Sequence, residues 1–98
     1  MLFYKPRRIS EIDFKRDGRI ALIGKVSEQF ENEFILSDET GRVEIFFEGE
    51  VKENQTVRVF CSIIENRLKA DIVQGLNDFN LQLFRKVENM YKKLGLNI

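Results

Sequence analysis

The stretch RIALIGKV, residues 19–26, places Ile20, Leu22 and Val26 at even spacings from one another. Because successive side chains of a strand point to opposite faces, this period of two predicts a strand with one buried face. Gly24 interrupts the buried series inside the strand, where glycine commonly marks a bend or a bulge. A strand that bends in its middle is typical of a small, strongly curved β-sheet.

The same alternation continues on both sides of a turn at residues 38–41, whose sequence is DETG. One face of the first segment has Phe34 and Leu36, which alternate with Ile35 and Ser37. In the second segment Val43, Ile45 and Phe47 alternate with Glu44, Phe46 and Glu48. Gly41 provides permissive dihedral angles at the end of the turn. These segments predict a β-hairpin.

A second hairpin is predicted further along the chain. Residues 57–64 and 68–73 both alternate, and the connection between them contains Glu65 and Asn66. Asparagine tolerates the positive φ that a two-residue hairpin loop requires. The side chains expected to point inward from all five strands are Ile20, Leu22, Val26, Leu36, Val43, Ile45, Val57, Val59, Cys61, Ile63, Leu68, Ala70 and Ile72.

Five strands with short links, and no strand–helix–strand crossover, predict a mainly β fold. We expect a five-stranded antiparallel barrel over residues 19–74, preceded by a lead-in over residues 1–18. In the lead-in, Ile9 and Ile12 are three residues apart, which indicates a short helical turn that packs on the barrel.

The hydrophobic period changes after the last strand and predicts one amphipathic α-helix over residues 78–94. Asp78 is a suitable N-cap, and Gly95 follows Lys92 and Lys93, which suit the C-terminal end of the helix dipole. The apolar stripe is wider than a lid on a small barrel requires, so we expect it to mediate oligomerisation, although the helix could instead fold flat on its own barrel. The predicted partner-binding residues are Phe79, Leu83, Phe84, Val87, Met90, Tyr91 and Leu94.

The composition argues against catalysis. The chain has no histidine and a single cysteine, Cys61, which excludes Ser–His and Cys–His nucleophile pairs, an internal disulfide and a cysteine-based zinc site. We therefore expect a protein that is not an enzyme and that holds no metal or cofactor. The absence of an apolar run long enough to span a bilayer, or of a secretory signal, favours an intracellular location.

The net charge is zero, but the charges are unevenly distributed. Residues 26–56 carry nine acidic and two basic side chains, whereas residues 1–25 carry seven basic and three acidic ones. Sites for single-stranded nucleic acid combine cations with aromatic platforms. The alternation places five such side chains on the outer surface, and these are the predicted nucleic-acid-binding residues: Lys25, Phe46, Arg58, Phe60 and Lys69.

Two features oppose strong binding. A helix or a terminal segment often covers the outward aromatics of so small a barrel, and Phe46 or Phe60 could lie beneath one. Phosphate affinity comes mainly from cations, so an acidic hairpin weakens it. The acidic side chains in question are Glu33, Asp38, Glu39, Glu44 and Glu48.

The pattern as a whole resembles the oligonucleotide/oligosaccharide-binding (OB) fold of single-stranded nucleic-acid-binding proteins. The resemblance is carried by IALIGKV (20–26), LSDETGRVEI (36–45), VRVFCSI (57–63) and LKADI (68–72). Within that class the chain is similar to the middle subunit of replication protein A and to the Stn-type subunit of telomere-capping complexes. The segment Asp78-Phe79-Asn80 lies where those subunits begin the helix that assembles their complex.

The resemblance implies a non-catalytic subunit of a complex that binds single-stranded DNA. The helix would hold another OB subunit, or a second copy of the chain in its absence, and the barrel would add weak contacts to the DNA. Two alternatives stay open: an autonomous OB module that binds single-stranded DNA or RNA by itself, and a purely structural adaptor.

Overall fold

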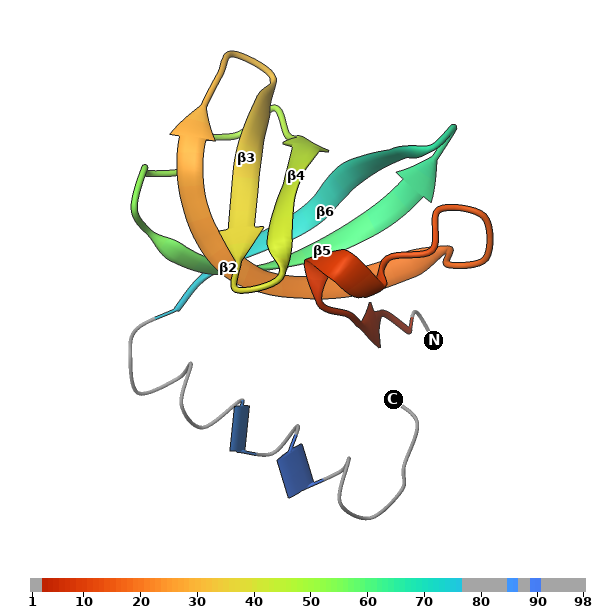
Figure 1. The fold of residues 1–98 in the computed structure, drawn as a ribbon. Coiled ribbons are helices and arrows are strands. Elements are labelled where there is room, and N and C mark those ends of the chain that lie inside the picture. Colours follow the sequence, from red (N-terminus) through yellow and green to blue (C-terminus); the bar gives the residue numbers. More distant parts are fainter. Residues whose placement is uncertain (1–2, 77–84, 87–88, 91–98) are drawn as a thin grey trace.

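A computed structural model describes residues 3–76, 85–86 and 89–90 of the chain. Within these residues, six strands form one strongly curled sheet (Figure 1). A short 3-10 helix, η1 (Ile9–Glu11), lies between the first two strands. The strands are β1 (Lys5–Pro6), β2 (Arg19–Gln29), β3 (Glu33–Asp38), β4 (Gly41–Phe46), β5 (Thr56–Ile64) and β6 (Arg67–Gly75).

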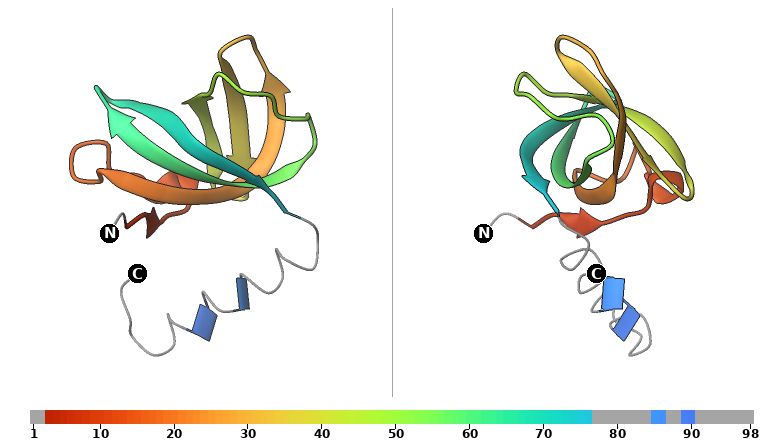
Figure 2. Two further views of the ribbon diagram at one scale, coloured as in Figure 1. Left: turned by 180° about the vertical axis from the view of Figure 1, so that it is seen from behind. Right: turned by 90° about the vertical axis from the view of Figure 1, so that its left-hand side faces the viewer.

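The long strand β2 organises the sheet because it pairs with two partners in succession. Its first part lies antiparallel to β5, from Arg19 opposite Ser62 to Lys25 opposite Thr56. Its second part lies antiparallel to β3. From β3 the pairings continue through β4, β6 and β5 and so return to β2, and the sheet curls around its core (Figures 1 and 2).

Gly24 lies where β2 passes from one partner to the other. A Cβ atom at this position would lie 2.5 Å from the backbone oxygen of Ser37 and 3.0 Å from Cγ of Leu36. The close approach of β3 therefore requires glycine here. Figure 1 shows β2 curving strongly along its length, as the glycine inside the strand predicted.

The prediction of a wholly antiparallel sheet is wrong for one pairing among the five long strands. β4 and β6 run parallel, with Ile45 opposite Leu68 and Phe46 opposite Lys69. The chain leaves β4 through the long connection at residues 47–55, crosses to β5, and then reverses through a tight hairpin into β6. The hairpin brings β6 back alongside β4 in the same direction, which local alternation in the sequence does not reveal.

The core lies inside the curled sheet and contains most of the side chains expected there. Val43 and Ile63 are only partly buried against it. Three residues that were not on the expected list also belong to the core cluster, because the lead-in, β3 and the connection before β5 each contribute one side chain: Ile9, Phe34 and Val51.

Ile72 is the one clear error in the predicted core, because its side chain is 55% exposed. A β-bulge shifts the register between β5 and β6, so that Cys61 pairs with Ala70 whereas its neighbour Phe60 pairs with Ile72. One extra residue on β6 reverses the alternation beyond the bulge. Ile72 therefore lies on the outer surface, and Val73 packs against the core instead.

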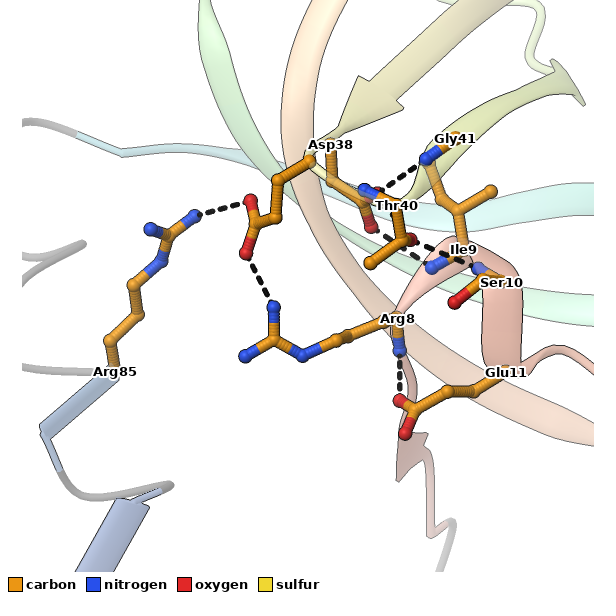
Figure 3. Close-up of polar contacts among 9 residues, drawn as sticks. Arg8, Ile9, Ser10, Glu11, Asp38, Thr40, Gly41 and Arg85 are labelled. Carbon is orange, nitrogen blue, oxygen red and sulfur yellow. Dashed lines mark hydrogen bonds and ion pairs between the residues drawn. The ribbon is translucent and has the colours of Figure 1, made fainter.

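The lead-in is fastened to the turn between β3 and β4 (Figure 3). The carboxylate of Asp38 accepts hydrogen bonds from the backbone N–H groups of Ile9, Thr40 and Gly41, at 2.9, 2.6 and 3.1 Å. The Thr40 hydroxyl oxygen accepts a further bond from the N–H of Ser10 at 3.0 Å. The expected helical turn over residues 9–12 is present as η1, and these bonds hold it against the sheet.

Most of the predicted helix over residues 78–94 lies outside the described residues. The four that the structure describes there, Arg85, Lys86, Asn89 and Met90, are helical. No helix within the described part of the chain is long and apolar enough to cross a membrane. The remaining predicted partner-binding residues also lie outside the described ranges: Phe79, Leu83, Phe84, Val87, Tyr91 and Leu94.

Candidate nucleic-acid interface

The five predicted nucleic-acid-binding side chains come from strands β2, β4, β5 and β6. Phe46 and Lys69 are direct partners across β4 and β6. Arg58 and Phe60 lie together on β5, with the guanidinium carbon of Arg58 5.1 Å from the centroid of the Phe60 ring. Lys25 lies at the end of the β2–β5 pairing, opposite Thr56, which precedes Arg58 by two residues on β5.

Phe46 and Lys69 line a groove between the end of β4 and the β5–β6 hairpin. The groove has a volume of about 530 Å³. The Phe46 side chain is 40% exposed, and the guanidinium carbon of Arg67 lies 5.7 Å from the centroid of its ring. The other side chains that line the groove are those of Phe47, Glu48, Ile64, Glu65, Leu68 and Ala70.

Arg67 is the groove residue that the sequence analysis missed. It precedes Lys69 by two residues, so the alternation of β6 places both cations on the same outer face. This two-residue spacing could have identified Arg67 from the sequence. Arg67 directly follows the hairpin turn, however, and the predicted strand begins at Leu68. An exposed aromatic ring with one guanidinium over it and an ammonium beside it can stack a base and contact the adjoining phosphates.

Phe60 is less accessible to a ligand than the alternation suggested. The ring of Tyr4, from the lead-in, packs edge-on against it with a centroid separation of 5.1 Å and an interplanar angle of 69°. Arg58 stacks on the same ring and donates hydrogen bonds of 2.7 and 3.1 Å to the side-chain oxygen of Gln74. The expectation that a terminal segment could cover an outward aromatic therefore applies to Phe60.

A polar network holds Tyr4 in this position. The Tyr4 hydroxyl donates to Oδ2 of Asp71 at 3.0 Å, and the Ser62 hydroxyl donates to the same oxygen at 2.6 Å. Desolvation and then the Asp71 carboxylate raise the pKa of Tyr4, so the phenol keeps the proton that it donates. The Tyr4–Phe60 contact is thus part of the fold.

The acidic hairpin is partly neutralised by contacts within the chain. Asp38 is engaged by the turn and the lead-in, and Glu39 forms ion pairs with Arg8 and Arg85. Glu33, however, pairs directly with Phe46 across β3 and β4 and so lies beside the groove. Negative charge remains next to the aromatic platform, and it weakens the attraction of phosphates to this surface.

Lys25 lines a second cavity, of about 260 Å³, which lies against the outer side of β2. Arg85, from the C-terminal part of the chain, lines the same cavity. Lys25 therefore belongs with the cations near Glu39 and not with the groove at Phe46.

Within the described residues, no three histidine, cysteine or acidic side chains lie close enough together to hold a metal ion. Burial raises the pKa of the Cys61 thiol to about 12, and the carboxylate of Asp71 adds to this rise. Because the thiolate is the nucleophilic form, a thiol with so high a pKa is a weak nucleophile. Cys61 is best described as a core residue of β5.

A curled sheet in the order β2–β3–β4–β6–β5, with a groove between the middle strand and the last hairpin, has the architecture of the OB fold. No family model and no curated protein matches the sequence. Solved structures do match, and they confirm the predicted OB fold.

Telomere capping protein Ten1 from Saccharomyces pombe is similar over 93% of this chain and 99% of its own, with a TM-score of 0.75 and 14% identity. A chain of the S. pombe Stn1–Ten1 complex matches 93% of this chain and 93% of its own, with a TM-score of 0.73 and 14% identity. A replication protein A heterotrimer bound to single-stranded DNA matches over 83% of this chain and 75% of its own, with a TM-score of 0.58 and 20% identity. The predicted likeness to these OB subunits is confirmed at the level of the fold.

Proposed function

We propose that this chain is a non-catalytic OB-fold subunit of a complex that binds single-stranded DNA. The groove at Phe46 supplies a weak DNA contact, and the C-terminal helix mediates assembly with another OB subunit. The proposal includes a closed barrel followed by one helix over residues 78–94.

The groove is the observation that carries the DNA-binding part of the proposal. Phe46 combines an exposed ring with the Arg67 guanidinium above it and Lys69 as its strand partner. A base that stacks on such a ring contributes about 1–3 kcal/mol to the free energy of binding, whichever of the bases it is. Because Glu33 adjoins the ring and the net charge is zero, the affinity of the single chain is expected to be low.

The assembly part of the proposal is supported by the side chains of two helical residues. Arg85 reaches the barrel and forms an ion pair with Glu39 at 3.4 Å, whereas the Met90 side chain is 55% exposed. In the proposed helix, a separation of five residues corresponds to a rotation of about 140°, so these two side chains would point in different directions. The apolar stripe that includes Met90 would then face away from the barrel and toward a partner.

The solved structures with this fold support the same assignment by analogy. One of them is a complex of Stn1 with Ten1, and another is a replication protein A heterotrimer bound to single-stranded DNA. Both are multi-subunit assemblies. An OB barrel with an apolar C-terminal helix fits such an assembly better than it fits an isolated module.

Affinity purification of the tagged full chain from its native cells tests the assembly. We expect a second OB-fold protein to co-purify, and we expect Met90→Asp to abolish the association because an unpaired buried carboxylate costs several kcal/mol. Asn89→Asp is the matched control, since it places the same charge on the neighbouring helical residue and should leave the association intact.

The purified chain is also examined by analytical ultracentrifugation. If no partner co-purifies and the unmodified chain stays monomeric at high concentration, the helix does not mediate assembly. That result would leave an autonomous module as the better account of the chain.

A further inference from the structure

Two arginines from distant parts of the chain converge on the carboxylate of Glu39, in the turn between β3 and β4. Arg8 belongs to the lead-in, and its guanidinium forms a short ion pair with Oε1 of Glu39. Arg85 belongs to the C-terminal helical residues, and its Nη2 lies 3.4 Å from Oε2. Figure 3 shows the guanidinium groups of Arg8 and Arg85 both directed toward one carboxylate, which is that of Glu39.

Two adjoining cavities meet at the junction, and Glu39 and Arg85 line both of them. The smaller cavity, of about 40 Å³, is also lined by Arg7 and Arg8. The larger one, of about 260 Å³, is also lined by Lys25. Arg8, Arg85 and Lys25 therefore line the junction together with the carboxylates of Asp38 and Glu39. The guanidinium of Arg7 pairs with Asp17 instead.

The arrangement has the chemistry of a phosphate-binding site in which the Glu39 carboxylate takes the place of the phosphate. Guanidinium groups pair with carboxylates and phosphates through the same forked donors. Asp38 is already engaged by backbone N–H groups of its own turn and of the lead-in, so Glu39 is the carboxylate that faces the arginines. The side chains of Arg8, Arg85 and Glu39 are 39%, 52% and 52% exposed, and ion pairs as exposed as this contribute little to stability. An external anion can therefore replace the Glu39 carboxylate readily.

We infer that the Arg8–Glu39–Arg85 junction binds a phosphodiester group of single-stranded nucleic acid, and that the Glu39 carboxylate occupies this position when no nucleic acid is bound. The inference rests on the proposed function, because it supplies a second contact for the same ligand. The junction adjoins the start of β4 at Gly41, and the Phe46 groove adjoins its end. At the rise of an extended strand the two sites lie about 17 Å apart along β4, so one oligonucleotide can reach both.

Fluorescence anisotropy with a labelled 15-nucleotide oligothymidylate and the full chain tests the inference. We expect Glu39→Gln to tighten binding about two- to fivefold, because it removes an exposed competing ion pair. The slope of log K against log salt should change by less than about 0.7, the value for one phosphate of a single strand, because both proteins contact the same phosphate. Glu53→Gln is the matched control, because it removes the same charge from an exposed position that lines neither the groove nor the junction.

Arg8→Gln and Arg85→Gln should each weaken binding about two- to fivefold and make the salt dependence shallower. Arg16→Gln is their control, since Arg16 pairs only weakly with Asp13, at 3.9 Å, in a turn away from the junction. Circular dichroism melting of every variant verifies that the fold is retained.

Backbone amide shifts of Thr40 and Gly41, followed by NMR during titration with inorganic phosphate, give a readout that does not depend on the groove. We expect these amides to shift on titration with phosphate or oligothymidylate, and to shift less with a polyglutamate peptide. A larger response to the peptide would assign the junction to an acidic protein segment and overturn the inference.

The outcomes also separate this inference from the proposed function. If oligothymidylate binds through Phe46 but Arg8→Gln and Arg85→Gln act no differently from Arg16→Gln, the junction is only a structural contact. If the unmodified chain binds no oligothymidylate and its amides do not respond to phosphate, both proposals are wrong.

Discussion

The carboxylate of Asp38 accepts a hydrogen bond of 2.9 Å from the backbone N–H of Ile9, which lies 29 residues earlier in the sequence. The same carboxylate accepts bonds from the backbone N–H groups of Thr40 and Gly41 and from the Thr40 hydroxyl. One side chain therefore closes the β3–β4 turn and also fixes the lead-in, whose Arg8 faces Glu39. The geometry of the junction therefore depends in large part on the Asp38 carboxylate.

Asp38→Ala should destabilise the protein by about 1–3 kcal/mol, because donors that the carboxylate now satisfies would lose their partner in a half-buried site. Urea unfolding followed by circular dichroism measures the change. Asp13→Ala is the control, since Asp13 accepts hydrogen bonds only within its own turn, from Lys15 and Arg16. If both variants lost the same free energy of unfolding, the hydrogen bond from Ile9 to Asp38 would not contribute to stability.

The same carboxylate should make stability depend on pH. Burial acts to raise the pKa of Asp38, but hydrogen bonds from Thr40, Ile9 and Gly41 outweigh it and hold the pKa below its ordinary value of 3.8. A group whose pKa is depressed on folding stabilises the fold above its unfolded pKa, and this stabilisation is lost as the pH falls through the folded value. The difference in unfolding free energy between the unmodified chain and Asp38→Asn should thus be constant near neutrality and shrink below about pH 4. A difference that grows toward acid pH would contradict the assigned contacts.

Gly24→Ala should destabilise the protein by about 1–3 kcal/mol, the range for an added group that forces a backbone shift. The added methyl group would lie 2.5 Å from the backbone oxygen of Ser37. Gly18→Ala is the matched control, because nothing lies within 4 Å of a Cβ atom at that position. We expect the control to change the unfolding free energy by less than about 0.5 kcal/mol. Thermal or urea unfolding of the two variants decides whether β3 approaches β2 this closely.

The β-bulge predicts opposite outcomes for two aliphatic residues of the same strand. Leu68 is 1% exposed, and Leu68→Ala should lower the free energy of unfolding by about 2–5 kcal/mol. Ile72 lies on the outer surface, so Ile72→Ala should cost less than about 1 kcal/mol. Urea midpoints measured on the two variants test the register directly, since a regular β6 without the bulge would bury both residues and make both substitutions costly.

Much of this architecture follows from local sequence patterns. Period-two alternation predicted the five long strands, and Gly24 marked the position where β2 changes partners. Alternation failed at Ile72, because Ile72 and Val73 are both apolar and the one-residue bulge between Ala70 and Ile72 leaves no signature in the sequence. It could not predict the parallel β4–β6 pairing either, since strand direction depends on how the long connection crosses the molecule.

The candidate sites were predictable only in part, for a physical reason. Phe46 and Lys69 were found because each projects outward from its own strand, which is a local property. The cover over Phe60 depends on Tyr4, 56 positions away, and the junction brings together Arg8, Glu39 and Arg85 from three separate segments. Such contacts arise from tertiary packing, which one sequence does not encode in any short pattern.

The most direct test of DNA binding by this fold is a salt series of oligothymidylate titrations with the full chain and with Phe46→Ala. We expect the unmodified chain to bind in the micromolar range or more weakly, with affinity that falls steeply as salt is added. Phe46→Ala should weaken binding about five- to tenfold or more, because it removes a stacking platform worth about 1–3 kcal/mol.

Phe14→Ala serves as its control in the same titrations, since Phe14 is an aromatic residue of similar exposure, 37%, in a turn away from the groove. The account predicts that Phe14→Ala binds like the unmodified chain and that Phe46→Ala does not. Tight, salt-insensitive binding, or equal binding by all three proteins, would contradict it.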